Sequence, residues 1–239
     1  MEAIEKVYVY CSNPSIQEYL PQGVEYLCRG EDLDQDSTKM NEVLARFAGE
    51  VPADVYVMTH TTAPFVRKES IEKGLEAVLS GAYDSAFAVK ELRDFLWKDG
   101  KPFNYQLDAI PRTQDLEPLY QETSGFYIYR QEVITQLGRR IGEKPKLVTV
   151  SEVESVDIDE AEDFLIADAC ITTGSSWERG PACEPGARAG LHTAGRGATA
   201  TTAALAWPTA AIWWTAWSRR GWTSSSAASS PKKWRTSRV

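Results

Sequence analysis

The sequence predicts an α/β fold, in which strands alternate with helices that cross the faces of a sheet. Residues 54–59 (DVYVMT) form an apolar run typical of a strand at the centre of a sheet. Residues 68–80 follow with helical spacing of their apolar side chains, which are Ile71, Leu75, Val78 and Leu79. Residues 84–89 (DSAFAV) predict the next strand. This succession indicates a βαβ crossover and therefore an α/β architecture.

The N-terminal part shows the same alternation. Residues 6–10 and 24–28 are short β-rich runs, and the Ser-Asn-Pro turn at 12–14 predicts a short helix over 15–20. Arg29 and Gly30 end the second run, and an acidic loop follows over 31–36. A helix is expected from about residue 38 to 48, with its apolar side chains on one face.

The second half continues the pattern. The Asp-Gly pair at 99–100 predicts a hairpin turn. A polar segment then leads into the aromatic strand FYIY at 126–129, and a helix over 131–141, a strand over 146–150 and a helix over 160–169 follow. We expect one α/β domain over residues 1–170.

Charge and composition exclude several classes of function. The chain of 239 residues has a net charge of −8, and residues 1–172 alone hold 17 basic and 32 acidic residues, or −15. Such an acidic domain is not expected to bind nucleic acid through bulk electrostatics. No run of about 20 apolar residues predicts a membrane span. Four cysteines without C-x-x-C spacing or a secretory signal indicate a reduced, cytoplasmic protein.

The composition changes abruptly near Cys170. Residues 171–239 are rich in Ala, Thr, Ser, Gly and Arg, and they hold seven of the eight tryptophans without helical or strand periodicity. We expect this tail to be disordered, and its composition is typical of an out-of-frame translation or a fusion scar. A nucleic-acid-binding tail is the functional alternative, and residues 210–214 are a candidate short helix.

Candidate ligand residues cluster at the ends of predicted strands. His60 follows the strand at 54–59, and Arg112 and Gln114 lie in the polar prelude to FYIY within residues 110–129. Ligands bind beyond the carboxyl ends of strands in open α/β sheets, so His60 and this prelude are candidates for one cleft. An Arg-Gln pair suits a carboxylate or a phosphate, and Arg29 has the same capacity beside a nucleotide. An ordinary surface loop explains residues 110–129 equally well, and for His60 and Arg29 an ordinary solvated side chain is the commoner outcome.

Asp157 and Asp159 are two residues apart, which places both carboxylates on one side of an extended segment. Two carboxylates plus substrate phosphates are a typical magnesium site. Asp159 is also a candidate helix cap, with Glu162 completing a capping box. Spacing alone favours the cap.

Five segments in order resemble the acylneuraminate cytidylyltransferases, the CMP-sialic acid synthetases, and their relatives that activate KDO. They are DVYVMTHTTAPF (54–65), ESIEKGLEAVLSGAYDSAFAV (69–89), DFLWKDGKPFNY (94–105), IPRTQDLEPLYQETSGFYIY (110–129) and SVDIDEAEDFLIADA (155–169). The resemblance covers about residues 4–169. It implies a Rossmann-like nucleotidyltransferase sheet, a dimer, and an enzyme that joins CTP to an acidic nonulosonate sugar and releases pyrophosphate.

The resemblance also assigns roles to residues. It implies that Asp157 and Asp159 bind magnesium, which reverses the preference for a helix cap. His60 stands where many relatives have a sugar-contacting Gln, and Arg112, Gln114 and Tyr127 resemble the sugar-recognition segment. The usual N-G-x-x-Y pattern leaves Tyr127 and Tyr129 both open as its aromatic residue. Arg29 and Ser37 resemble nucleotide contacts.

Two departures from the family pattern affect the expected activity. Family members begin with a strand and a basic glycine-rich loop that cradles the CTP phosphates, and residues 1–10 do not supply it. The family's C-terminal helix also ends or changes near Cys170. We therefore expect an N-terminally truncated domain of weak or no activity by itself. The alternatives are a non-catalytic remnant that binds a sugar or a partner subunit, and a KDO-type cytidylyltransferase.

Overall fold

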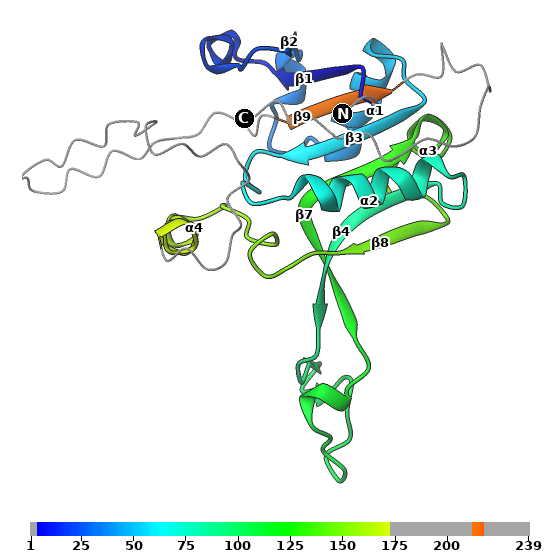
Figure 1. The fold of residues 1–239 in the computed structure, drawn as a ribbon, viewed down its shortest axis with the longest axis vertical. Helices are drawn as coiled ribbons and strands as arrows, with labels where there is room; N and C mark the ends of the chain where they lie inside the picture. Colours follow the sequence, from blue (N-terminus) through cyan, green and yellow to red (C-terminus); the bar gives the residue numbers. More distant parts are fainter. Residues whose placement is uncertain (1–3, 173–211, 218–239) are drawn as a thin grey trace, which may run out of the picture.

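The computed structural model of the chain describes residues 4–172 and 212–217 (Figure 1). Its main feature is a seven-stranded sheet in the order β2-β1-β9-β3-β7-β4-β8. These strands are β1 (Lys6–Cys11), β2 (Val24–Cys28), β3 (Val55–His60), β4 (Ser85–Leu92), β7 (Leu119–Arg130), β8 (Pro145–Thr149) and β9 (Ile212–Trp217). β7 and β9 run antiparallel to their neighbours, and the other five are parallel to one another. The predicted α/β class is confirmed.

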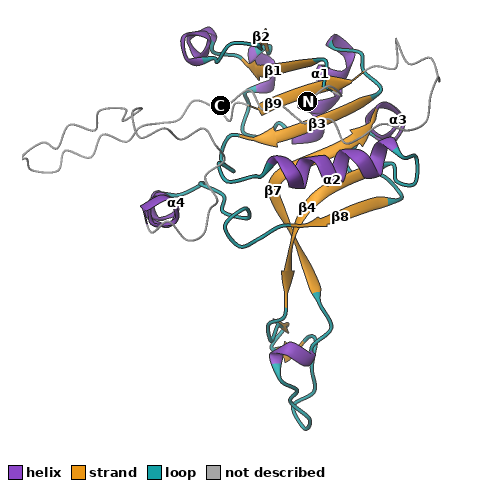
Figure 2. Cartoon of the chain, viewed as in Figure 1, coloured by secondary structure: helices purple, strands orange, loops and turns teal. Residues whose placement is uncertain are grey.

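Helices cover both faces of this sheet (Figure 2). The helices are α1 (Met40–Glu50), α2 (Lys68–Leu79), α3 (Gln131–Leu137) and α4 (Ala161–Thr172). α1 and α3 pack on one face, where Phe47 contacts Tyr10 and Tyr56 edge to face. α2 packs on the other face through Leu75 and Val78. α4 stands apart from the sheet (Figure 1), and among its residues Ala167 alone is buried. None of the described helices is long and apolar enough to cross a bilayer.

Two local features hold these layers together. The Tyr56 hydroxyl donates to the Val51 carbonyl at 2.9 Å and accepts from the Ala53 amide at 3.2 Å, which ties the end of α1 to the start of β3. On the other face, a Cβ added at Gly74 would lie 2.8 Å from Cδ1 of Ile128. Only a glycine lets α2 approach β7 this closely, because a larger residue would force Ile128 to move.

The expected elements agree with the structure except at several boundaries. The segment expected as a short helix over 15–20 is a 3₁₀ helix, η1 (Pro14–Tyr19), and the helix expected to reach 141 ends at Leu137. Gly138 adopts a left-handed conformation with φ of 64° and stops it there. The predicted hairpin is confirmed as β5 (Trp97–Lys98) and β6 (Lys101–Pro102), with positive φ at both turn residues.

Residues 93–118 form an arm that projects from the sheet. β4 and β7 continue beyond the other strands as a twisted pair, with an irregularity between Phe87 and Val89, and carry the arm outward (Figure 1). The arm contains the β5–β6 hairpin and a short 3₁₀ turn, η3 (Thr113–Asp115). Another 3₁₀ turn, η2 (Glu31–Leu33), lies outside the arm, in the loop after β2. Several large apolar side chains of the arm are exposed, namely Phe95, Trp97, Phe103, Leu107 and Ile110.

β9 differs from the expectation for the C-terminal segment. The sequence predicts no regular structure over 171–239, with a short helix at 210–214 as one alternative, whereas residues 212–217 form a strand between β1 and β3. Two neighbouring strands with unpaired backbone groups offer hydrogen bonds to any extended segment, and this overrides the weak local pattern. The rest of the expectation, over 173–211 and 218–239, lies outside the described residues.

Glu154 anchors the loop that follows β8. Its carboxylate is buried and accepts hydrogen bonds from the Ser70 hydroxyl at 2.6 Å and the Arg67 amide at 3.1 Å, at the start of α2. Its second oxygen accepts from the Ser151 amide at 3.3 Å. One side chain therefore joins two segments about 85 residues apart in the sequence.

We expect Glu154→Gln to lower the free energy of unfolding by about 1–3 kcal/mol, because an amide nitrogen cannot accept the hydrogen bonds that one carboxylate oxygen accepts. Urea denaturation followed by circular dichroism measures the change. Glu152→Gln is the matched control, since Glu152 is 75% exposed and pairs with Lys90, and it should change stability by less than about 0.5 kcal/mol. Equal stability of the two variants would contradict the anchoring role.

Candidate functional site

The candidate site lies where the parallel strands end. The carboxyl ends of β1, β2, β3 and β8 lead into Ser12, Arg29, Thr61 and Val150, which all leave the sheet at the same edge. The Ile158 amide donates to the Thr62 carbonyl at 2.8 Å, which holds the loop after β8 against the loop after β3. This is the edge at which open α/β sheets bind ligands.

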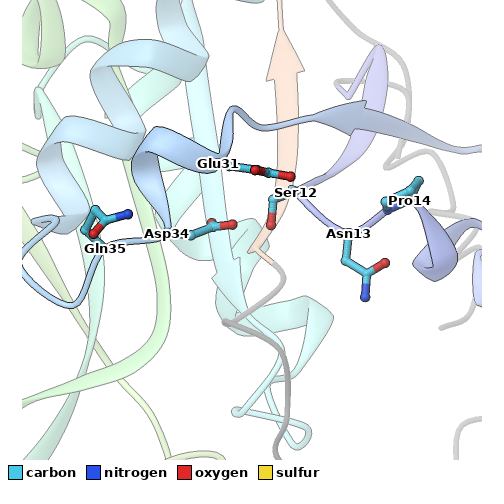
Figure 3. A pocket seen from close by; sticks show the side chains of 6 residues that line it. All are labelled: Ser12, Asn13, Pro14, Glu31, Asp34 and Gln35. Carbon is cyan, nitrogen blue, oxygen red and sulfur yellow. The ribbon is translucent and has the colours of Figure 1, made fainter.

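A polar hollow of about 500 Å³ opens beyond β1 and β2 (Figure 3). Ser12, Asn13, Glu31, Asp34 and Gln35 contribute its polar side chains, and Pro14 completes the wall. It is large enough for part of a nucleotide.

Arg29 adjoins this hollow through Asp34, one of the residues that line it. Its side chain is buried, pairs with Asp34, and has an Nε without a partner among the described residues. A hydrogen bond with Ser12 and the Arg29 charge hold the pKa of Asp34 below its ordinary value, although burial opposes this. The sequence offers Arg29 as a nucleotide contact or a solvated side chain, whereas the structure buries it in an ion pair with Asp34. Ser37 is exposed in the following loop, outside the wall of the hollow.

His60 ends β3 and contacts the aromatic ring of Tyr127, with ring centroids 6.4 Å apart in an edge-to-face arrangement. Burial lowers the pKa of His60, the Arg140 charge lowers it further, and Asp157 opposes both. His60 is therefore neutral at pH 7, and it lies within electrostatic range of an arginine and an aspartate. A neutral imidazole both donates and accepts hydrogen bonds, which suits contact with a polar ligand.

Asp157 and Asp159 lie close enough to repel each other. The Asp157 charge is the main cause that raises the pKa of Asp159, with burial, Asp163 and Glu160 adding to it. Oδ1 of Asp157 is buried and has no hydrogen-bond partner among the described residues. An orphaned carboxylate oxygen beside a second carboxylate fits a divalent cation. No group of three or more metal-ligating side chains gathers in the part of the chain that the structure describes, so the rest of a cation's shell would come from substrate and water.

The helix-cap interpretation of Asp159 is wrong in its details. α4 begins at Ala161, and the side chain that reaches back to the amides of Asp159 and Glu160 is that of Asp163, at 3.0 and 2.8 Å. Glu162 does not make that contact. The Asp159 carboxylate accepts none of the hydrogen bonds seen among the described residues, so it stays available to a ligand.

The structure distinguishes Tyr127 from Tyr129. Tyr129 lies within the core beside Tyr56, with its ring fully buried and its hydroxyl without a partner among the described residues. Tyr127 is the tyrosine that reaches His60. Burial, then a hydrogen bond to Glu122, raises its pKa far above the ordinary value, so it stays protonated. Arg140 covers its ring at 3.8 Å, so Tyr127 itself is almost inaccessible.

Arg112 and Gln114 are not brought to His60 within one chain. Both are exposed in the arm, Arg112 just before η3 and Gln114 within it, and Arg112 forms two hydrogen bonds to Asp115, at 2.8 and 3.0 Å. The backbone of Gln114 accepts from Arg93 at 3.2 Å. These side chains face solvent on a projecting element.

Sequence reasoning missed Arg140, Glu122 and Glu154. Arg140 follows the end of α3 in a run, GRRIGEK, that reads as an ordinary basic turn. Glu122 sits four residues before FYIY, where a long antiparallel strand was not expected. In a regular strand a spacing of five would place Glu122 and Tyr127 on opposite faces, so the sequence gives no signal of their hydrogen bond, which accompanies the irregular pairing of β4 with β7.

Comparison with known proteins identifies a family for the chain. A family model described as cytidylyltransferase matches residues 1–168 of the chain. No curated protein matches it significantly. Among solved structures, it is similar to the bifunctional IspDF from Campylobacter jejuni, at 16% identity and a TM-score of 0.46, over 67% of this chain and 41% of that one. It is also similar to a 4-diphosphocytidyl-2C-methyl-D-erythritol synthase, at 12% identity and a TM-score of 0.44, over 69% of this chain and 81% of that one.

The chain thus spans less than half of the bifunctional protein that it resembles. The family model covers well over half of the chain itself and includes the sheet edge with His60, Asp157 and Asp159. By this match the chain belongs to the cytidylyltransferase family.

Proposed function

We propose that the chain is built to join CTP to an acidic nonulosonate sugar of the sialic acid type, giving a CMP-sugar and pyrophosphate. The observation that carries this proposal is the Asp157–Asp159 pair, with its orphaned oxygen and raised pKa, beside a neutral His60. In the reaction, the sugar hydroxyl attacks the α-phosphorus, the bond to the bridging oxygen breaks, and pyrophosphate leaves while the hydroxyl proton passes to water.

The candidate site residues fall into two groups, one for the nucleotide and one for the sugar and the metal ion. The hollow lined by Ser12, Asn13 and Asp34 would hold the nucleotide, and His60 would hydrogen-bond the sugar. Asp157 and Asp159 would hold magnesium, which supplies charge neutralisation on the phosphates when bound. Both groups meet at one sheet edge, as in-line transfer requires.

A non-catalytic sugar-binding domain is the second candidate, and β9 favours it. β9 lies between β1 and β3 and runs antiparallel to both. At the edge of the sheet where β1 and β3 have their carboxyl ends, near Ser12 and His60, β9 therefore has its amino end. No parallel strand in the described residues therefore delivers a phosphate-binding loop at the centre of this edge. Calorimetric titration with CTP separates the candidates, because only the transferase binds it.

We also propose a homodimer formed through the arm. Trp97 is 57% exposed and Leu107 is 59% exposed, and both belong to the apolar side chains that the arm carries away from the sheet. Exposed apolar clusters of this kind mark protein contacts. In such a dimer, Arg112 and Gln114 of one protomer would serve the site of its partner.

We expect Asp157→Asn to lower CTP-dependent pyrophosphate release by about 100-fold and to remove its dependence on magnesium. Glu76→Gln, an exposed carboxylate on α2, is the control and should keep full turnover. If the wild type itself releases no pyrophosphate with any acidic sugar, the transferase proposal fails. If Asp157→Asn matches the wild type, the metal pair is misassigned.

Asp159→Asn has an additional stability readout. A carboxyl whose pKa is raised on folding costs stability as the pH rises through that pKa. Without metal at pH 7.5, the variant should therefore unfold at a slightly higher temperature than the wild type, while its magnesium binding is lost. A lower melting temperature would show that Asp159 makes a structural contact instead.

His60→Gln should weaken the pH dependence of stability. The folded pKa of His60 lies below its unfolded value near 6.5, so the unfolded chain takes up a proton that the folded chain does not. The contribution of His60 to the free energy of unfolding is therefore complete above about pH 6.5. It decreases as the pH is lowered further, by up to about 1.4 kcal/mol per pH unit. Melting temperatures at pH 7.5 and 5.5 should differ more for the wild type than for the variant. Equal differences would mean that His60 ionises normally.

Replacing Trp97 and Leu107 together by serine should convert the dimer to a monomer of 26.6 kDa. Light scattering after size exclusion measures the mass. Tyr19→Ser is the control, because Tyr19 is 77% exposed but lies on η1, away from the arm. A monomeric wild type, or a dimer that survives the double substitution, would refute assembly through the arm.

A further inference from the structure

Cys11 and Cys28 occupy neighbouring positions at the ends of two parallel strands. Cys11 is the last residue of β1 and Cys28 is the last residue of β2, and the register of the two strands places them side by side. The Arg29 amide donates to the Cys11 carbonyl at 3.1 Å, so the backbone pairing continues through this point. Paired strands lie about 4.8 Å apart, which falls within the range of about 4.4–6.8 Å between Cα atoms that a disulfide spans.

Tyr26 is a shared neighbour of the two thiols. It lies two residues before Cys28, on the same face of β2, and its hydroxyl donates to the carbonyl of Ser12, directly after Cys11, at 3.4 Å. Burial first, then a hydrogen bond to Cys28 and the charges of the Cys28 and Cys11 thiolates, raise the pKa of Tyr26 to about 12. One hydroxyl therefore lies close to both sulfur atoms, which agrees with the register of the strands.

The two thiols differ in accessibility, which suits an oxidation in two steps. Cys28 is exposed on the strand at the edge of the sheet, whereas Cys11 is only 3% exposed. The Asn13 amide donates to Sγ of Cys11 at 3.4 Å, and Sγ of Cys28 donates to the Arg29 carbonyl at 3.7 Å. Hydrogen bonds to sulfur are weak, so rotation of the Cys28 side chain toward Cys11 loses little.

We propose that Cys11 and Cys28 form a reversible disulfide between the ends of β1 and β2, with a low-molecular-weight disulfide such as oxidised glutathione as the co-reactant. The Cys28 sulfur, after losing its proton, attacks one sulfur of the oxidant, whose S–S bond breaks, and one glutathione leaves and takes up a proton. The Cys11 sulfur, after losing its own proton, attacks Cys28 in this mixed disulfide and releases the second glutathione in the same way. Two protein thiols are thereby oxidised, and one disulfide is reduced to two thiols.

The disulfide lies next to the polar hollow beyond β1 and β2. Ser12, which follows Cys11, lines that hollow, and Arg29, which follows Cys28, pairs with Asp34 in its wall. The redox state of the two cysteines therefore decides whether the two strand ends that carry these residues are covalently joined. The site is independent of the proposed function, because its chemistry needs neither CTP nor an acidic sugar.

The test uses the full chain with Cys170→Ser and Cys183→Ser, which leaves Cys11 and Cys28 as its only cysteines. We expect oxidised glutathione to lower the intact mass by two hydrogen atoms and to block alkylation of both thiols by a maleimide, and dithiothreitol to reverse both changes. The oxidised chain should keep its circular dichroism spectrum. It should also melt about 5 °C or more above the reduced chain, because a bridge that fits the sheet constrains mainly the unfolded state.

Two further variants of this chain separate the two steps. Cys11→Ala keeps the exposed thiol and should stop at one glutathione adduct, whereas Cys28→Ser keeps only the buried thiol and should not react. Melting temperatures of the reduced variants establish that each is folded.

The proposal is overturned if the chain that retains both cysteines does not react, or if it keeps a glutathione adduct without closing the bridge. Reaction of Cys11 in the folded Cys28→Ser variant overturns it as well. So does a bridge that forms only with loss of the circular dichroism spectrum or that lowers the melting temperature.

Discussion

Burial of β3 and β7 on both faces is the constraint on which the rest of this structure depends. Tyr56 and Met58 face α1 and α3, while Val57 and Ile128 face α2. Removing so much apolar surface from water is the dominant stabilising contribution in a domain of this size. Because both faces are covered, ligands reach these strands only at their ends. Polar residues are tolerated there, and the candidate site occupies that edge.

The chemistry of the candidate site follows from the charged groups that the fold brings to one edge of the sheet. Asp157 keeps an oxygen without a partner, Asp159 carries a raised pKa, and Arg140 stacks on a tyrosine with two donors to spare. Burial and the Arg140 charge lower the pKa of His60, with Asp157 opposing them, so His60 is neutral at pH 7. Isolated charges of this kind cost stability in the free protein and are repaid when a ligand binds.

The sequence carries enough information for the local elements but less for their pairing. Apolar periodicity predicts α2 and β3 to within a residue or two, because their stripes are long and regular. It does not predict that β7 begins at Leu119, since Tyr120, Gln121 and Glu122 are exposed and this part of the strand joins the sheet only through pairing with β4. β9 is missed for the same reason, as its position depends on two partner strands rather than on its own pattern. Among the candidate site residues, His60 is named from its position after a predicted strand, and Asp157 and Asp159 are named from their spacing and the family resemblance. Arg140 is not, because only the packing of a turn over Tyr127 distinguishes it from a surface arginine.

The pairing of β9 has a consequence for the order in which the protein folds during synthesis. β1 and β3 are complete once residue 60 has been made, yet the strand that separates them comes from residues 212–217. At about 5–20 residues per second, translation of the intervening segment takes roughly 10–30 seconds. Throughout that interval, the edges of β1 and β3 that later pair with β9 have unpaired backbone groups. Unpaired strand edges of this kind can pair with a strand of another chain. The centre of the sheet is thus the last part of the domain to close on the ribosome, and early release from the ribosome would leave the edges of β1 and β3 open.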